Sequence, residues 1–318
     1  MKLNFLYENR FTESPIDKNP QEEMFARDWE VLLNHHSGAP WKLLREMFVE
    51  LCFPVGDGQS ENPELLSALK HGILPQIPNM WVPTKPDGIR VYLHPTMAGR
   101  LPVIECESDS DFVYLQRSLV YRCEPRHVPD SRGATIIKNY NNWARVNMHR
   151  NSIIGDIPKD PALYRDYIAL LSHRYYSGVA PETLGLESTG WRQKSFILRR
   201  EHEVAHYMTQ RFYHSAKNEI HDEIIADFMG LTAVFGDYDP VKFLTFLGLE
   251  NYPKYRMGGR LEIYLTTNGD DFNSLCEILW RAVQNAAICF RETGKDRIMM
   301  FHTLCRTSVA DMARGNFA

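Results

Sequence analysis

One segment in the second half of the chain carries many side chains that can bind metal ions or transfer protons. Between Arg199 and Gly230 there are four histidines and six carboxylates, set among apolar residues. Residues 202–206 read H-E-x-x-H. On an α-helix, His202 and His206 are neighbours on one face, so both can bind one zinc ion at about 2 Å. Glu203 then lies beside the metal, where it can act as general base towards a metal-bound water.

The sequence around this motif predicts a helix over about 190–214. Phe196, Met208 and Phe212 supply apolar surface, and neither proline nor glycine interrupts residues 192–225. The alternative is a solvated helix face on which Glu and His are merely exposed. The apolar flanks and a second cluster of carboxylates further along the chain favour the metal site.

A catalytic zinc needs a third protein ligand and one open position. A second helix is predicted over 218–235, with Asn218 as its N-cap and Gly236 at its end. Inside it, Glu223 and Asp227 are four residues apart among apolar neighbours, and a buried carboxylate pair is costly unless it binds a cation or a hydrogen-bond donor. We therefore assign Glu223 as the third ligand.

Asp227 is then placed to accept the other ring N–H of a zinc-bound histidine, most simply His202, and so to fix its tautomer. Gly230 continues the same face and would let the two helices approach closely. Two alternatives stay open. Glu223 and Asp227 could be exposed charges paired with Lys217 or Arg211, and Glu219 and His221 are rival ligands.

The H-E-x-x-H motif followed by E-x-x-A-D at 223–227 resembles the gluzincin zinc metallopeptidases, and within them the HtpX type, over roughly residues 160–265. The resemblance implies a zincin-like fold and peptide hydrolysis. It also implies a downstream His-Pro element followed by an Arg that stabilises the oxyanion. Here Tyr252-Pro253 stands in the His-Pro place, and Arg256 or Arg260 would be the Arg. The membrane-spanning helices of that type are missing, so we expect a divergent, soluble relative.

An oxyanion formed during hydrolysis needs a stabilising group besides the metal. Tyrosine and arginine side chains that follow the ligand helix are candidates, and of these we select Tyr252 and Arg260 as candidate catalytic residues over Tyr255, Arg256 and Tyr264. An extended peptide substrate often docks along a sheet edge. Residues 134–147 are our choice for that edge, although an ordinary internal strand and turn explains them equally well.

The remaining pattern predicts an α+β fold in which a small β-sheet precedes a helix-rich C-terminal half. A weak boundary divides an N-terminal region of unknown role, 1–130, from a zincin-like domain, 131–318, and one single domain is the alternative. Helices are expected over 19–53 with a break at 37–38, then over 62–72, 160–176, 190–214, 218–235, 239–248, 271–292 and 295–314. Strands are expected at 90–95, 101–108, 112–124 and 134–140.

Composition narrows the classes of partner. The formal net charge of −4 over 318 residues argues against a large nucleic-acid surface. No apolar run approaches about 18 residues, so no membrane span is expected, and the N-terminus lacks a signal-peptide core. The six cysteines form no CxxC pair and are expected to be small buried residues in a reducing compartment. We expect a cytoplasmic protein.

The sequence therefore predicts a zinc-dependent metallopeptidase that acts on a peptide or protein substrate. Zn²⁺ is the expected cofactor, held by His202, His206 and Glu223. Two other functions remain open at this stage. The chain could be a non-catalytic regulatory or binding protein with a structural zinc site, closed by a fourth ligand such as His221 or Asp222, or a zinc hydrolase acting on a non-peptide amide.

Overall fold

The computed structural model describes residues 4–12, 16–36, 39–76, 78, 81–150, 159–214, 219–264 and 270–318. The chain divides into two compact units. One comprises Gln21–Arg174, and the other combines Met1–Pro20 with Tyr175–Ala318. The boundary near residue 130 that the sequence suggested falls inside the first of these units. The two units are described separately.

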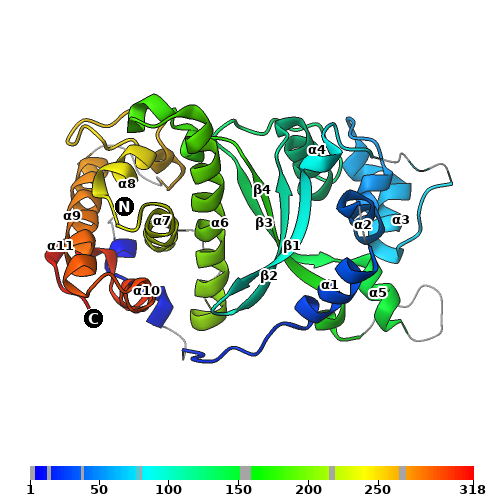
Figure 1. The fold of residues 1–318 in the computed structure, drawn as a ribbon, viewed down its shortest axis with the longest axis horizontal. Helices are drawn as coiled ribbons and strands as arrows, with labels where there is room; N and C mark the ends of the chain where they lie inside the picture. The colour runs from blue at the N-terminus through cyan, green and yellow to red at the C-terminus, as the bar shows by residue number, and fades with distance from the viewer. Residues whose placement is uncertain are drawn as a thin grey trace. The chain divides into compact units, whose positions relative to one another are not determined.

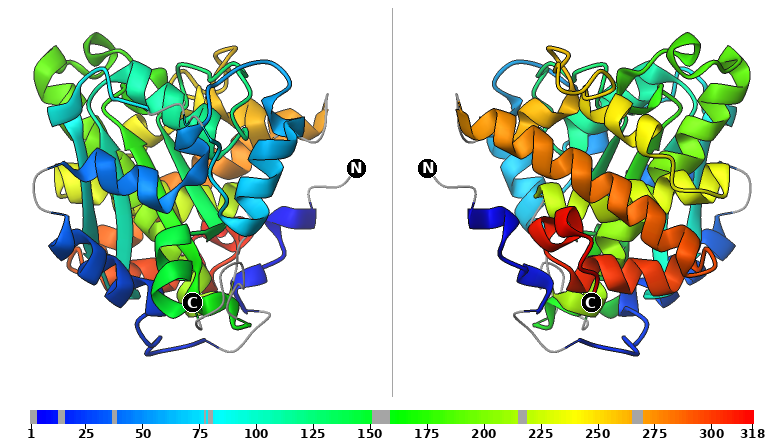
Figure 2. Two further views of the ribbon diagram at one scale, coloured as in Figure 1. Left: turned by 90° about the vertical axis from the view of Figure 1, so that its right-hand side faces the viewer. Right: turned by 90° about the vertical axis from the view of Figure 1, so that its left-hand side faces the viewer.

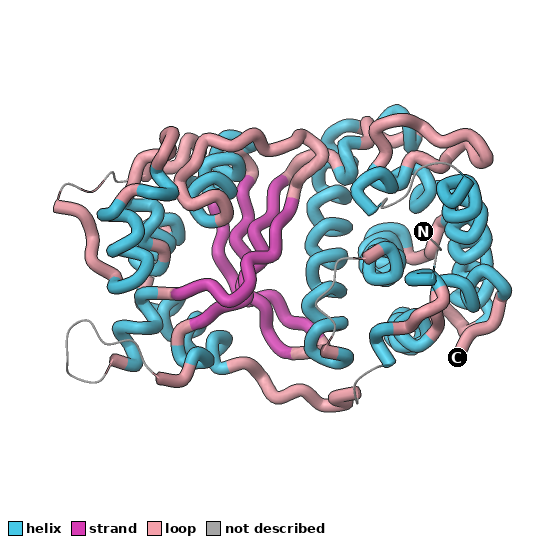
Figure 3. Tube along the Cα trace, turned by 180° about the vertical axis from the view of Figure 1, so that it is seen from behind, coloured by secondary structure: helices cyan, strands magenta, loops and turns pink. Residues whose placement is uncertain are grey.

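The described strands of the Gln21–Arg174 unit form a four-stranded sheet (Figures 1 and 3). Its strands are β1 (Ile89–Thr96), β2 (Gly99–Cys106), β3 (Ala134–Asn141) and β4 (Arg165–Ser172), in the order β1-β2-β4-β3. β1 and β2 form an antiparallel hairpin, β2 pairs with β4 in parallel, and β4 pairs with β3 in antiparallel fashion. β3 is therefore an edge strand, although residues 143–147 of the proposed docking edge are helical.

The helices of this unit lie on one side of its sheet (Figures 1 and 3). They are α1 (Met24–His35), α2 (Pro40–Met47), α3 (Pro63–His71), α4 (Asp109–Leu119) and α5 (Trp143–His149). At the centre of the unit, Arg145 is fully buried and donates to Asp28 at 2.8 Å and to Asp166 at 2.5 Å. A buried cation is tolerated because both carboxylates neutralise it.

Residues 160–176 do not form the helix that the sequence suggested. They contain β4, which is buried along nearly its whole length. A strand whose side chains are nearly all buried reads as an unbroken apolar run, because no alternate residue faces water. The run "YIALL" therefore satisfied a helical pattern as well as a strand pattern.

The opposite error affects residues 112–124, which were expected to be a strand. Asp109–Leu119 is α4, and its start is marked by Ser108, whose side chain accepts a hydrogen bond from the backbone N–H of Asp111. Phe112, Leu115 and Leu119 are buried at helical spacing. The many aromatic and β-branched residues in this segment favour a strand. The N-capping serine and the helical spacing of the apolar residues instead indicate a helix.

The Met1–Pro20 and Tyr175–Ala318 unit is helical in its described residues. It contains α6 (Ser188–Tyr213), α7 (Ile220–Phe235), α8 (Pro240–Leu247), α9 (Asp270–Glu292), α10 (Arg297–Arg306) and α11 (Val309–Arg314). α9 runs along α11 (Figure 2, right), and Asn285 of α9 donates to the carbonyls of Met312 and Ala313 at 3.0 and 3.1 Å. The α+β class expected from the sequence is confirmed.

The predicted helices of this unit are present, with two differences. Gly236 ends α7 in the left-handed conformation, as expected, but the predicted N-cap Asn218 lies outside the described residues. The single helix expected over 295–314 is two helices. The chain leaves α10 at Thr307, and Ser308 then caps α11 by accepting from the backbone N–H of Asp311.

All six cysteines are free thiols, and five of them are buried. Burial raises the pKa of several of these thiols, including that of Cys106, which lies well above its ordinary value. None of the helices in the described ranges is both long and apolar enough to cross a membrane.

Candidate metal centre

The close packing of α6 on α7 positions the candidate site. Gly230 of α7 faces the backbone of Leu198 in α6, and a Cβ atom placed on Gly230 would stand 2.7 Å from the Leu198 carbonyl oxygen. No real Cβ atom approaches so closely. The absence of a side chain at this position therefore lets the two helices come together, as the sequence suggested.

We expect Gly230→Ala to separate α6 from α7. Overpacking of this kind costs about 1–3 kcal/mol, and it should also weaken metal binding, because the donors lie on both helices. Gly190→Ala is the matched control, since Gly190 lies in α6 with open space around it and alanine there should stabilise by about 0.5–1 kcal/mol. Urea unfolding of both variants measures the difference. Equal stability of the two variants would contradict the close approach.

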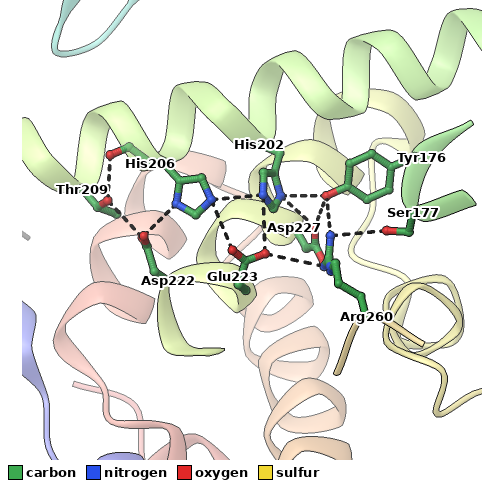
Figure 4. Close-up of polar contacts among 9 residues, drawn as sticks. All are labelled: Tyr176, Ser177, His202, His206, Thr209, Asp222, Glu223, Asp227 and Arg260. Atoms are coloured by element: carbon green, nitrogen blue, oxygen red, sulfur yellow. Dashed lines mark hydrogen bonds and ion pairs between the residues drawn. The ribbon is translucent and has the colours of Figure 1, made fainter. Parts of the chain in front are cut away.

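Three donor groups converge between the two helices (Figure 4). His202 and His206 point from α6 towards Glu223 of α7. The two Nε2 atoms are 3.1 Å apart. The Glu223 oxygens Oε2 and Oε1 lie 3.6 Å from the Nε2 atoms of His202 and His206, respectively. These three residues could hold a metal ion.

His202, His206 and Glu223 are called the donor triangle below. The spacing of their ligand atoms is close to that of a tetrahedral metal site. In a regular tetrahedron with ligands at 2.0–2.1 Å, neighbouring donor atoms are about 3.3 Å apart. The two Nε2 atoms are 3.1 Å apart, close to that value, and each has one Glu223 oxygen at 3.6 Å, Oε2 for His202 and Oε1 for His206. Two histidine nitrogens with one carboxylate are the protein ligands of a known class of catalytic zinc sites.

Asp227 and Tyr176 orient the ring of His202. The Nδ1 atom of His202 lies 2.8 Å from Oδ1 of Asp227 and 2.8 Å from the hydroxyl of Tyr176, which in turn donates to the same Asp227 oxygen. The carboxylate favours the tautomer that carries its proton on Nδ1. The lone pair of Nε2 is then directed towards Glu223 and His206, as a metal ligand requires.

Asp222 and Thr209 hold His206 in the corresponding way. The Nδ1 atom of His206 lies 2.7 Å from Oδ2 of Asp222, whose other oxygen accepts from the Thr209 hydroxyl at 3.0 Å. Thus each histidine presents Nε2 to the centre and Nδ1 to a buried carboxylate. Without a cation between them, the two Nε2 lone pairs would face one another at 3.1 Å.

The charges around the donor atoms shift their pKa values in directions that favour a bound cation. Burial by itself raises the pKa of Glu223, but His206, His202 and Arg260 outweigh it and hold this pKa well below its usual range. Glu223 therefore stays ionised. Burial by itself lowers the pKa of His206, yet Asp222 and Glu223 raise it well above its ordinary value. A cation at this centre is thus strongly favoured, and a metal ion would compete with a proton for it.

Arg260 contacts the two residues that orient His202. It lies in the 3₁₀ turn Arg260–Tyr264, and its guanidinium donates to Asp227 and, at 3.0 Å, to the Tyr176 hydroxyl. Burial raises the pKa of Asp227, but Arg260 and His202 bring it below its ordinary value. In this structure Arg260 therefore acts through Asp227 and Tyr176, and a direct contact with substrate stays a prediction.

The other predicted site residues occupy different places. Glu203 is half-buried on α6, and its carboxylate has no hydrogen bond or ion pair with any described residue. The ring of Tyr252 stacks on Trp280 of α9 at 5.3 Å, which is a packing contact. Tyr264, a rejected rival of Tyr252, lies beside Glu223. Burial and Glu223 together raise the pKa of Tyr264.

Sequence reasoning missed Tyr176 and Asp222. Tyr176 lies in the short 3₁₀ turn Tyr176–Gly178. Its position in the sequence relative to the H-E-x-x-H motif does not indicate that it contacts His202. The sequence suggested Asp222 only as a possible fourth ligand, but it is 5% exposed and bound to Nδ1 of His206. The pair Asp222-Glu223 was the available signal, because adjacent helical carboxylates among apolar neighbours can each face a different histidine.

His221, the other possible fourth ligand, is also engaged elsewhere. It is buried, and its Nε2 atom lies 2.9 Å from the carbonyl oxygen of Leu304. Burial lowers the pKa of His221. Among the described residues no fourth His, Cys, Asp or Glu joins the donor triangle.

One protein-family model matches this chain along nearly its whole length. Residues 2–316 match the model of a family of unknown function, DUF7005. The chain belongs to this family. No curated protein and no solved structure gave a match. The family match covers residues of both compact units.

We expect Asp222→Asn to lower metal affinity by about 10–100-fold, because loss of a carboxylate that orients a histidine ligand has this effect. The amide can also favour the wrong tautomer of His206. Competition with a chromophoric chelator measures the affinity. Asp237→Asn is the matched control, since Asp237 lies just beyond α7, where it forms an ion pair with Lys295 and accepts from the backbone N–H of Tyr238. An unchanged affinity in Asp222→Asn would show that Asp222 does not support a ligand.

Proposed function

We propose that this protein is a zinc-dependent metallopeptidase. One observation supports this proposal more strongly than any other. The Nε2 atoms of two histidines lie 3.1 Å apart, each with a Glu223 oxygen at 3.6 Å, while both outward histidine nitrogens face carboxylates. Such support by carboxylates is typical of functional zinc sites. The motif resemblance to the gluzincins points to the same activity.

In this proposal each residue of the chain has a distinct task. His202, His206 and Glu223 would hold zinc, which when bound supplies a Lewis acid that lowers the pKa of water towards about 7. Glu203 takes the proton from the attacking water and delivers it to the leaving amine. Its carboxylate is suited to this task because no described residue occupies it.

Asp227, Tyr176 and Arg260 keep His202 in its ligand orientation, and Asp222 does the same for His206. Tyr264 is the better-placed candidate for stabilising the oxyanion, since it lies beside Glu223 whereas Tyr252 packs on Trp280. Arg260 could contribute to that role from its position near Glu223, at 3.9 Å between Nη2 and Oε2.

The rival function is a structural zinc site in a non-catalytic protein. Such a site is closed by four protein ligands. The two residues expected to close it, His221 and Asp222, are bound to Leu304 and His206 instead. This arrangement favours an open position and thus the enzyme.

The six free cysteines further support our proposal of a cytoplasmic protein.

The test is hydrolysis of a mixture of unstructured peptides, followed by mass spectrometry of the products. Zinc-loaded protein should cleave peptide bonds, and a chelator should abolish the cleavage. Cleavage that survives chelation would belong to a contaminating protease. If the protein holds zinc but cleaves neither peptides nor small amides, the proposed function is wrong and the structural site is favoured.

A further inference from the structure

A second candidate site lies in the Gln21–Arg174 unit and is independent of the metal centre. Its deepest member is Glu50, in the 3₁₀ turn Val49–Cys52. Glu50 is 2% exposed, and its Oε2 atom has no hydrogen-bond partner. Burial raises the pKa of this carboxyl to about 7. A buried carboxyl oxygen without a partner is rare in a folded protein, because its desolvation is uncompensated.

The hydroxyl of Tyr140, on the edge strand β3, is a second buried polar group of this kind. It also has no hydrogen-bond partner. It lies close enough to Glu50 that, after burial, the carboxyl is the main cause of the raised pKa of Tyr140. The two groups are thus neighbours, and their mutual contact lowers the pKa of Glu50 and raises that of Tyr140. Neither Glu50 Oε2 nor the hydroxyl, however, has a partner at full hydrogen-bond geometry.

Both residues line a pocket with a volume of about 500 Å³. This is within the range of pockets that bind small molecules, about 300–1,000 Å³. The wall is shaped by an irregularity in β3, where the pairing with β4 shifts between Lys138 and Tyr140. Asn139 at this bulge has a φ of 55°. Bulges of this type redirect side chains and are frequent next to binding sites.

The charge at the rim differs from the charge at the base. Arg122, Lys138 and Arg165 line the pocket and are exposed, whereas Glu50 is the one acidic residue among the described lining residues. Arg122 lowers the pKa of Glu50 and therefore lies near it. The pocket thus combines a buried carboxyl that needs a donor with a basic rim that attracts an anion.

We propose that this pocket binds a small zwitterion of the chemical class of a free amino acid or short peptide. An ammonium group would donate to Oε2 of Glu50 and to the Tyr140 oxygen, and a carboxylate would pair with Arg122 and the other rim cations. An ammonium group fits the base better than a neutral hydroxyl, since it leaves a neutral pair in a buried place. Arginine at the rim suits a carboxylate because its fork binds both oxygens.

The test is isothermal titration calorimetry of the full chain, from which metal has been removed, with glycine, L-alanine, L-glutamate and dialanine. At least one of these should bind at about 1 mM or below. N-acetyl-L-alanine lacks the ammonium group and L-alaninamide lacks the carboxylate, so both should bind more weakly than L-alanine. Glu50→Gln should lower the affinity for the tightest-binding probe about thirtyfold or more, and Arg122→Ala should lower it about tenfold. Circular dichroism verifies that each variant is folded.

Glu46→Gln is the matched control, because Glu46 is exposed and pairs with His36 in the same unit. It should leave the affinity unchanged. If none of the four probes binds, water satisfies Glu50 and Tyr140, and the proposal is wrong. Binding that is equal in Glu50→Gln and wild type would also overturn it. Because metal is absent, failure of this test leaves the proposed peptidase untouched.

Discussion

Glu203→Gln is expected to lower the rate of peptide hydrolysis by about 10²–10⁴-fold, the usual contribution of a positioned general base. The amide has nearly the shape of the carboxylate but cannot accept the proton of the attacking water. Zinc content should stay unchanged, because the donor triangle consists of His202, His206 and Glu223 and does not include Glu203. Steady-state kinetics with a peptide substrate, together with metal analysis of the same sample, measures both quantities.

Glu201→Gln is the matched control for this experiment. Glu201 lies two residues earlier on α6 and pairs with Arg200 at 2.9 Å, so its charge is used away from the donor triangle. Its removal should leave the rate close to that of wild type. If Glu203→Gln hydrolyses peptides as fast as Glu201→Gln while holding the same amount of zinc, Glu203 is not the base.

Arg260→Leu is expected to lower the free energy of unfolding by about 3–5 kcal/mol, the cost of leaving a buried charge without its partner. Arg260 is 14% exposed in its side chain and pairs with Asp227, which is fully buried. Glu223 is also buried close by, 3.9 Å from Nη2 of Arg260. The two buried carboxylates would then be left with the histidines and the Tyr176 hydroxyl. Urea unfolding of metal-free protein measures the loss.

The metal should partly restore the stability of this variant, because a cation bound by Glu223 replaces some of the missing charge. Arg256→Leu is the matched control, since Arg256 is 45% exposed, pairs with Glu250 and donates to the Thr245 carbonyl at 2.8 Å. Removal of an exposed ion pair costs about 0–1 kcal/mol. A loss in Arg260→Leu no larger than that in Arg256→Leu would contradict the anchoring role assigned to Arg260.

The sequence predicted the parts of the site that depend on helical spacing. His202 and His206 are four residues apart on one helix, and so are Glu223 and Asp227 on the next. The period of the helix alone therefore brings each pair together. Gly230 could be predicted as a point of close approach for the same reason. Helix packing then places the two pairs against one another.

The parts that sequence could not predict depend on contacts between distant segments. Tyr176 reaches His202 from a turn before α6, and Arg260 reaches Asp227 from a turn beyond α8. The fold shows the same limit. β4 reads as a helix because its neighbours on both sides come from elsewhere in the chain, and the compact unit that holds the metal centre draws in Met1–Pro20 from the far end of the sequence.

Metal analysis of the purified chain tests the central claim most directly. Wild-type protein, purified without chelator and then dialysed against trace zinc, should contain about one zinc per chain by mass spectrometry. His206→Ala, which removes one corner of the donor triangle, should contain almost none. A wild type without bound zinc, or a His206→Ala variant that holds as much zinc as wild type, would contradict the assignment of His202, His206 and Glu223 as a zinc site.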